Sequence, residues 1–485
     1  MQRYTFLFCM AVALVLSSSC SQDQPTLPDQ SSDVGQPTGV TIDPETAAAE
    51  LIARAGWEVS TDSREGGPAL TGSSGVILSF TSEPLAGDVV HHTFVIQVGP
   101  GSYDLIALHR VVREPHPGNP MRTRKSIFLQ HGDAVGFVKF LFGPASPNTA
   151  DDHAAAIYLA QRDIDVWGID QNWVLAPADL TDQSVMAGWG VQNQVDNLRM
   201  GMAIARHARL MTGNGYRKMI LLGYSSGVMT GYAYLNEESQ LPPGQRHASG
   251  FMQADLGYKI GPEYEDARLS ACADAEFAQS EMDAGNYIDY TPQLFQALGY
   301  LSQTDPGGAS PIIPGLTNFE AFFLFVGQTY MIAAYAPWWH YFAPVFDNGD
   351  PAGFNYTPLA GAEDFVQTAC ELYPTRFWYD LSVILCDEED VPWDDHLSEI
   401  TVPILNIAPA GGIGRVADYP LTLLGSSDIT TLYIQLQADD ERELDFGHID
   451  LWTATNAPDL VWQPMVDWID DHTPGSHGRG HDRHN

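Results

Sequence analysis

The chain has 485 residues, 44% of them hydrophobic, which is enough for one large domain with an insertion or for two domains. Acidic residues outnumber basic ones 61 to 23, and the formal net charge is -38 at pH 7. Such a charge repels the phosphates of nucleic acids, so no nucleic-acid partner is expected.

The first 20 residues have the pattern of a secretory signal peptide. Arg3 supplies a positive charge, residues 4–16 form an apolar stretch too short to span a bilayer, and small residues follow. We therefore expect export to the periplasm, the outer membrane or the medium. Cys20 resembles the cleavage site of a bacterial lipoprotein, although Ser17 stands where such signals usually have leucine. Membrane attachment through a lipidated Cys20 is one expectation, and export without an anchor is the other.

Two segments have the composition of flexible chain. Residues 21–44 are rich in Ser, Gln, Asp, Pro and Thr, which predicts a flexible linker. Residues 472–485 read HTPGSHGRGHDRHN, which predicts a His-rich disordered tail. Between them we expect a core formed by residues 45–256 and 401–471, interrupted by an insertion over residues 257–400.

Short apolar runs alternate with helical patterns along the core. HTFVIQVG and YDLIALHRVV, separated by Pro-Gly-Ser, predict a β-hairpin. Further strands are predicted at 126–130, 164–169, 218–223, 250–255, 403–408 and 431–436, and helices at 151–162, 191–211 and 458–470. This alternation predicts an α/β fold with a mostly parallel, eight-stranded sheet and helices on both faces.

Residues 257–400 break the alternation. They contain an acidic helical pattern near 263–284, turns rich in Pro and Gly, and an aromatic run at 319–342. The apolar part of that run is short and carries Gln328, so a membrane span is not expected. We interpret the segment as a cap inserted between two core strands. Its aromatic side chains either line a substrate pocket or pack the interior of the cap.

Three cysteines follow the signal region: Cys272, Cys370 and Cys386. An oxidising compartment would give one disulfide and one free thiol, with the pairing left open. The sequence has no metal-type Cys/His spacing and no dinucleotide or phosphate-binding motif, so neither a metal nor a cofactor is expected. The acidic run 387–390 could bind calcium, but a solvated loop is the simpler interpretation.

Gly223-Tyr224-Ser225-Ser226-Gly227 has the G-x-S-x-G spacing. When a strand turns at once into a helix, the serine oxygen projects above the sheet, and the flanking glycines leave room for the strained turn. An apolar strand pattern precedes this motif and a helical pattern follows it. Ser225 is therefore the predicted nucleophile.

His131-Gly132-Asp133 follows the strand predicted at 126–130. Acyl transfer requires two N–H groups directed at the oxyanion of the tetrahedral intermediate. Ser226 would provide one of them, and Asp133 or Ala134 the other. The side chain of His131 is expected to be structural.

A histidine and an acid are expected after the serine, in the order serine, acid, histidine. His448 follows the last predicted strand and is the predicted general base. Asp418, in the loop after strand 403–408, is the preferred acid, and Asp255, at the end of strand 250–255, is the alternative. Asp428 is excluded because it precedes its strand and so lies at the opposite edge of the sheet.

With these residues the core resembles the α/β-hydrolase superfamily. FLQHG followed by YLAQRDIDVWGID is similar to the acid-lipase and esterase branch, over about residues 90–256 and 400–470. Asp133, where acid lipases usually have an apolar residue, and Gln171-Asn172, in place of a basic-glycine turn, depart from that branch. The resemblance implies a serine hydrolase that cleaves carboxylic esters of small molecules or lipids.

Two other functions remain open at this point. The same residues would serve an amidase, a peptidase or an acyltransferase, because this scaffold supports many chemistries. A binding lipoprotein on a hydrolase scaffold is the alternative of another class. Loss of a catalytic residue would favour it, whereas Ser225 and His448 are both present.

Overall fold

A computed structural model describes residues 42–59, 75–328 and 336–475. The predicted signal peptide and Cys20 lie outside the described residues, as do most of the predicted linker and tail. Two boundaries differ from expectation. Asp43 caps helix α2 (Pro44–Ala55) by accepting a hydrogen bond of 3.0 Å from the Thr46 N–H, so the linker ends earlier than predicted. His472 is the last residue of helix α14 (Gln463–His472), so it does not belong to a tail.

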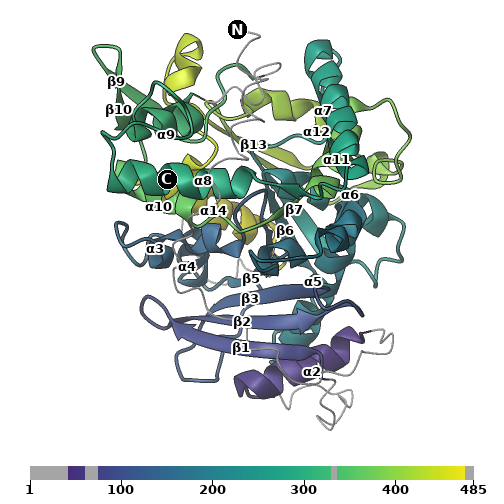
Figure 1. Ribbon diagram of the computed structural model, residues 1–485. Coiled ribbons are helices and arrows are strands. Elements are labelled where there is room, and N and C mark those ends of the chain that lie inside the picture. Colours follow the sequence, from purple (N-terminus) through teal and green to yellow (C-terminus); the bar gives the residue numbers. More distant parts are fainter. Residues whose placement is uncertain (1–41, 60–74, 329–335, 476–485) are drawn as a thin grey trace, which may run out of the picture.

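The central sheet has nine strands among the described residues, in the order β1-β2-β3-β5-β4-β6-β7-β12-β13 (Figure 1). They are β1 (Ile77–Pro84), β2 (Val89–Gln97), β3 (Leu105–Arg113), β4 (Ser126–Gln130), β5 (Asp165–Asp170), β6 (Met219–Tyr224), β7 (Ala248–Ala254), β12 (Ile404–Pro409) and β13 (Ile429–Ile434). The pairs from β5 through β13 are parallel, and the three at the β1 end are antiparallel. The predicted fold class is confirmed.

The sheet has one strand more than the eight expected. All eight predicted strands are present, and the ninth is β1. It lies at the edge of the sheet, and most of its residues are exposed or half-buried. A strand with little buried surface lacks the alternating apolar pattern that reveals strands in a sequence.

Helices cover both faces of the sheet. Successive residues of a strand point to opposite faces, and both faces carry apolar side chains that the helices bury. Phe128, Leu221 and Phe251 pack in one cluster with residues of α2, α5 (Val191–Met211) and α6 (Ser226–Ser239). Ile127, Leu222 and Met252 pack in another cluster with α4 (Ala155–Ala160) and α14. Each fully buried large apolar side chain contributes roughly 1.5–3 kcal/mol.

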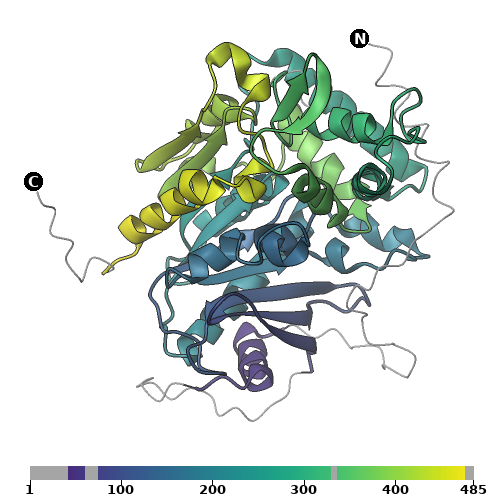
Figure 2. The ribbon, with the colours of Figure 1, turned by 90° about the vertical axis from the view of Figure 1, so that its left-hand side faces the viewer.

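The chain between β7 and β12 forms the cap (Figure 2). It contains α7 (Glu265–Asp283), β8 (Ile288–Asp289), α8 (Thr291–Thr304), α9 (Asn318–Gly327), β9 (Pro344–Asp347), β10 (Asp350–Phe354), α10 (Leu359–Gln367), β11 (Tyr373–Pro374) and α11 (Thr375–Cys386). Its aromatic side chains, among them Phe295, Phe322 and Phe342, pack in one cluster with Ala134 and Ile449 of the core. Part of the aromatic run thus packs the cap onto the core. None of the described helices is long and apolar enough to cross a membrane.

A disulfide joins the cap helices α7 and α11. It links Cys272 to Cys386, with 4.7 Å between their Cα atoms, while Cys370 is a buried free cysteine. Burial raises the pKa of the Cys370 thiol, which keeps it protonated and unreactive. The disulfide therefore crosslinks two helices of the cap, and bonds of this kind persist in oxidising surroundings.

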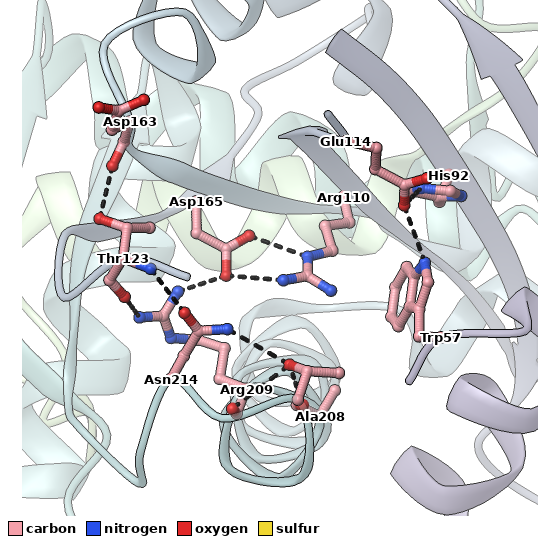
Figure 3. A network of polar contacts seen from close by, with 11 residues as sticks. Trp57, His92, Arg110, Glu114, Thr123, Asp163, Asp165, Ala208, Arg209 and Asn214 are labelled. Atoms are coloured by element: carbon pink, nitrogen blue, oxygen red, sulfur yellow. Dashed lines mark hydrogen bonds and ion pairs between the residues drawn. The ribbon is translucent and has the colours of Figure 1, made fainter. Parts of the chain in front are cut away.

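A buried ion cluster lies under the antiparallel part of the sheet (Figure 3). Arg110 binds both carboxylate oxygens of Asp165, at 2.9 and 3.0 Å, and Arg209 contacts one of them. The Arg110 guanidinium also lies 4.4 Å from the centre of the Trp57 ring. Burial alone would raise the pKa of Asp165, but the two guanidinium groups hold it below its usual value. The carboxylate is thus the counter-ion for two buried cations.

We predict that Asp165→Asn lowers the free energy of unfolding by about 3–5 kcal/mol, because it leaves buried guanidinium groups without a counter-ion. Asp163→Asn is the matched control. Asp163 is half-exposed, pairs with Arg113 at 2.7 Å, and has a left-handed φ of 60° that asparagine tolerates. That control should change stability by less than about 1 kcal/mol. Urea unfolding measures both, and equal effects would contradict the prediction.

Candidate active site

Ser225 lies in a strained turn between β6 and α6. Its φ of 56° and ψ of -134° are unusual for a residue with a side chain. A Cβ on Gly223 would lie 2.3 Å from the Gly227 carbonyl oxygen, and a Cβ on Gly227 would lie 2.4 Å from that of His131. Only glycine fits at these two positions, which is the steric reason for the G-x-S-x-G spacing. The serine itself is half-buried.

The loop after β4 passes directly over this turn. A Cβ on Gly132 would lie 2.5 Å from the Ser225 Cβ. Asp133, the next residue in the loop, is therefore close to the serine. Ser226 is the first residue of α6, where backbone N–H groups have no partner within the helix. The structure therefore brings Asp133 and Ser226, the two predicted oxyanion residues, to Ser225.

His131 precedes this loop and has a structural role. Its Nδ1 lies 2.8 Å from the Gly132 carbonyl oxygen, and its Nε2 accepts a hydrogen bond of 3.2 Å from the Gln171 N–H. Burial lowers its pKa to about 4, so the ring is neutral at pH 7. Both ring nitrogens are thus used to hold the loop.

His448 is paired with Asp255. The His448 Nδ1 lies 2.6 Å from Asp255 Oδ2, and both side chains are buried. The Asp255 Oδ1 accepts a hydrogen bond of 2.8 Å from the Ile413 N–H. Asp255 follows β7, the neighbour of β6, so its carboxylate and Ser225 come from adjacent strand ends, whereas His448 reaches them from the chain after β13. This arrangement leaves His448 Nε2 as the ring nitrogen available for proton transfer.

The preference for Asp418 as the acid is wrong. Asp418 begins the short helix α12 (Asp418–Leu421) and accepts a hydrogen bond of 3.0 Å from Asn406 Nδ2. Its other partner is Arg415, at 3.9 Å. A position in the loop after β12 was not sufficient, because the part of that loop nearest the pair is backbone, whose Ile413 N–H binds Asp255, while the Asp418 side chain contacts Asn406 and Arg415. The alternative, Asp255, makes the contact.

Aromatic side chains hold the His448 ring. The Tyr224 ring stacks on it with 4.7 Å between centroids, and the Tyr224 hydroxyl donates a hydrogen bond of 3.2 Å to the His448 carbonyl oxygen. The Trp339 ring of the cap lies 5.3 Å away, and the His448 N–H donates to the His340 carbonyl oxygen at 3.0 Å. The residue before the serine and the cap therefore position the histidine together.

Asp133 also uses its side chain. Its Oδ1 accepts hydrogen bonds from the hydroxyl groups of Ser226 and of Tyr373 in the cap strand β11. Part of the Asp133 residue is exposed to solvent. Desolvation by the surrounding protein nevertheless raises the pKa of its carboxyl, and this effect outweighs the two hydroxyl hydrogen bonds, which lower the pKa. This carboxyl thus joins the oxyanion loop, helix α6 and the cap.

Lys139, in the short helix η2 (Phe137–Leu141), is a buried cation near this site. Its Nζ lies 4.7 Å from the centre of the Tyr224 ring, and burial lowers its pKa to about 7. Neither Lys139 nor Tyr373 was predicted. Tyr373 lies 240 residues from Asp133 in a cap of unrecognised fold, and a lone lysine carries no sequence signal.

Few of the described residues could form a metal site. Within those ranges the one group of potential ligands is Cys272, Cys386 and Glu388, and its two sulfur atoms are already joined in the disulfide. In the acidic run 387–390, Asp387 pairs with Lys259 at 2.5 Å, and Glu388 pairs with Arg268 at 3.1 Å. The structure gives these carboxylates protein partners.

The sequence matches no protein-family model and no curated protein sequence. Solved structures do match. A candidate lipase from Sulfolobus solfataricus is 14% identical and has a TM-score of 0.51, over 81% of this chain and 99% of that one. An esterase from Exiguobacterium antarcticum is 12% identical, with a TM-score of 0.39 over 76% and 96% of the two chains. A haloalkane dehalogenase variant from Bradyrhizobium elkanii is 11% identical, with a TM-score of 0.37 over 80% and 98%. The sheet order, the turn at Ser225 and the first of these likenesses establish that this chain has the α/β-hydrolase fold.

Proposed function

We propose that this protein is a serine hydrolase that cleaves carboxylic esters through an acyl-enzyme on Ser225. The observation that carries the proposal is the His448–Asp255 pair at 2.6 Å, next to the strained serine turn. The likeness to a candidate lipase supports ester substrates. The Trp339 ring of the cap, which lies beside His448, supports an apolar acyl or alcohol group in the substrate.

The proposed reaction has two steps, acylation of the serine and hydrolysis of the acyl-enzyme. The Ser225 oxygen attacks the ester carbonyl while His448 Nε2 takes its proton, and Asp255 stabilises the imidazolium through Nδ1. The N–H groups of Asp133 and Ser226 bind the oxyanion as the tetrahedral intermediate forms. His448 returns the proton to the leaving alcohol, and the acyl group stays on Ser225. Water, activated by His448, then releases the carboxylic acid and frees the serine.

Removal of the Ser225 oxygen tests the proposed nucleophile. Ser225→Ala should lower the turnover of p-nitrophenyl esters by about 10⁴-fold or more, because no acyl-enzyme forms. A fluorophosphonate should label the native protein at Ser225 and leave the variant unlabelled. Ser280→Ala, on the exposed face of α7, is the control and should keep native turnover. Unchanged turnover in Ser225→Ala would contradict an acyl-enzyme, and a native protein that takes no label would favour a binding protein. Chain lengths from acetate to palmitate separate an esterase from a lipase.

Asp255 and Asp418 can be compared by replacing each carboxylate with an amide. Asp255→Asn should lower kcat by about 10⁴-fold, because asparagine favours the wrong tautomer of His448. Asp418→Asn should stay within about threefold of the native enzyme, because it alters contacts with Asn406 and Arg415 and none with His448. The same ester assay measures both variants. The reverse ranking would restore Asp418 as the acid.

We further propose that the protein is exported. Residues 1–20 support this by their signal pattern, and the Cys272–Cys386 disulfide supports it because such bonds persist in oxidising compartments. N-terminal sequencing of the protein from cell fractions should find a mature chain without the signal, outside the cytoplasm. A mature N-terminus at a lipidated Cys20 would establish membrane attachment. Recovery of the full chain from the cytoplasm would contradict export.

A further inference from the structure

The two residues assigned to the oxyanion hole are bonded to each other through their side chains. The Ser226 hydroxyl donates a hydrogen bond to Asp133 Oδ1. Ser226 is fixed as the first residue of an α-helix, whereas Asp133 lies in a loop, next to Ala134 with a left-handed φ of 62°. The bond therefore ties the less constrained of the two backbone donors to the more constrained one.

The cap holds the same loop from the other side. The Tyr373 hydroxyl donates to Asp133 Oδ1, and the Cys370 N–H donates a hydrogen bond of 2.6 Å to the Ala134 carbonyl oxygen. The Tyr373 ring is buried, and its edge packs against Trp173, with 5.2 Å between ring centroids. Tyr373 is thus a rigid support, and one carboxylate oxygen receives a bond from the core and a bond from the cap.

Steric contact constrains the loop from below. Gly132 lies so close to Ser225 that a Cβ on it would be 2.5 Å from the serine Cβ, so the loop cannot move toward the turn that carries Ser225. The carboxyl contacts of Asp133 oppose movement of the loop away from that turn. An oxyanion donor must lie within about 3 Å of the developing charge, and a misplacement of about 1 Å can cost about 100-fold in rate.

We propose that the Asp133 carboxyl is a positioning group that sets the spacing of the two oxyanion donors and makes this spacing depend on Tyr373 of the cap. This inference rests on the proposed function. Because the oxyanion forms in the tetrahedral intermediate and its flanking transition states and is absent from the bound ester, the carboxyl acts on kcat and leaves KM largely unchanged. The feature that matters is an oxygen that accepts two hydroxyl bonds, which an amide oxygen also provides.

The test uses Asp133→Ala, Asp133→Asn, Tyr373→Phe and the double variant Asp133→Ala/Tyr373→Phe in the full chain. Asp133→Ala should lower kcat by about 10- to 100-fold, with KM within about threefold of the native value. Asp133→Asn should recover most of kcat, because the amide oxygen still accepts both bonds. Tyr373→Phe should lower kcat by a smaller factor. The double variant should be no slower than Asp133→Ala alone, because both changes remove the same contact.

Tyr379→Phe in α11 is the control, and it should keep the native kcat. Thermal unfolding of every variant separates loss of fold from loss of position, and Asp133→Asn and Tyr373→Phe carry the test if Asp133→Ala is unstable. Three results would overturn the inference but not the proposed function. They are a native kcat in Asp133→Ala, an Asp133→Asn variant as slow as Asp133→Ala, and losses that multiply in the double variant. A native protein that turns over no ester would overturn the proposed function, and the inference with it.

Discussion

The close approach of backbone segments around Ser225 is the constraint on which the site depends. Three glycines make it possible, since a Cβ on Gly132, Gly223 or Gly227 would lie 2.3–2.5 Å from its nearest neighbour. A residue with φ of 56° keeps that conformation only where its surroundings over-determine it. Strands β4 and β6 are neighbours in the sheet, so the oxyanion loop and the serine turn meet at the same edge. The strain of the serine is thus maintained by the same packing that brings the loop after β4 to it.

The histidine is held by a different part of the chain, the cap. The Ile449 N–H donates a hydrogen bond of 2.8 Å to the Tyr341 carbonyl oxygen, next to the His448–His340 bond. A Cβ on Gly411 or Gly447 would lie 2.5 or 2.7 Å from the His340 ring, so the loops after β12 and β13 close tightly on this cap segment. The cap therefore supplies backbone partners to the segment that carries His448.

The parts of the site that follow from local patterns could be predicted from the sequence. Ser225 and the oxyanion loop stand directly after apolar strands, where a short motif is informative, and His448 lies in the chain after the last strand. The acid was left between Asp418 and Asp255, which both follow predicted strands, and the sequence preferred the wrong one. The choice depends on contacts that only the fold makes: His448 Nδ1 lies at one Asp255 oxygen, and the Ile413 N–H, 158 residues away, donates to the other. Tyr373 was missed because it reaches Asp133 only through the fold of the cap, and β1 because an exposed edge strand has a weak apolar pattern.

The loop after β12 explains why Asp255 can serve alone. This loop reads APAGGIG, and a Cβ on Gly412 would lie 2.2 Å from Asp255 Oδ2, so the glycine makes room for the carboxylate of the neighbouring strand. The two oxygens are divided between Ile413 N–H and His448 Nδ1. A second carboxylate in this loop would share the site with Asp255, and like charges at such a distance raise the pKa of one of them. A protonated acid would stabilise a His448 imidazolium poorly, so a glycine at position 412 suits the role proposed for Asp255 better than a second carboxylate there would.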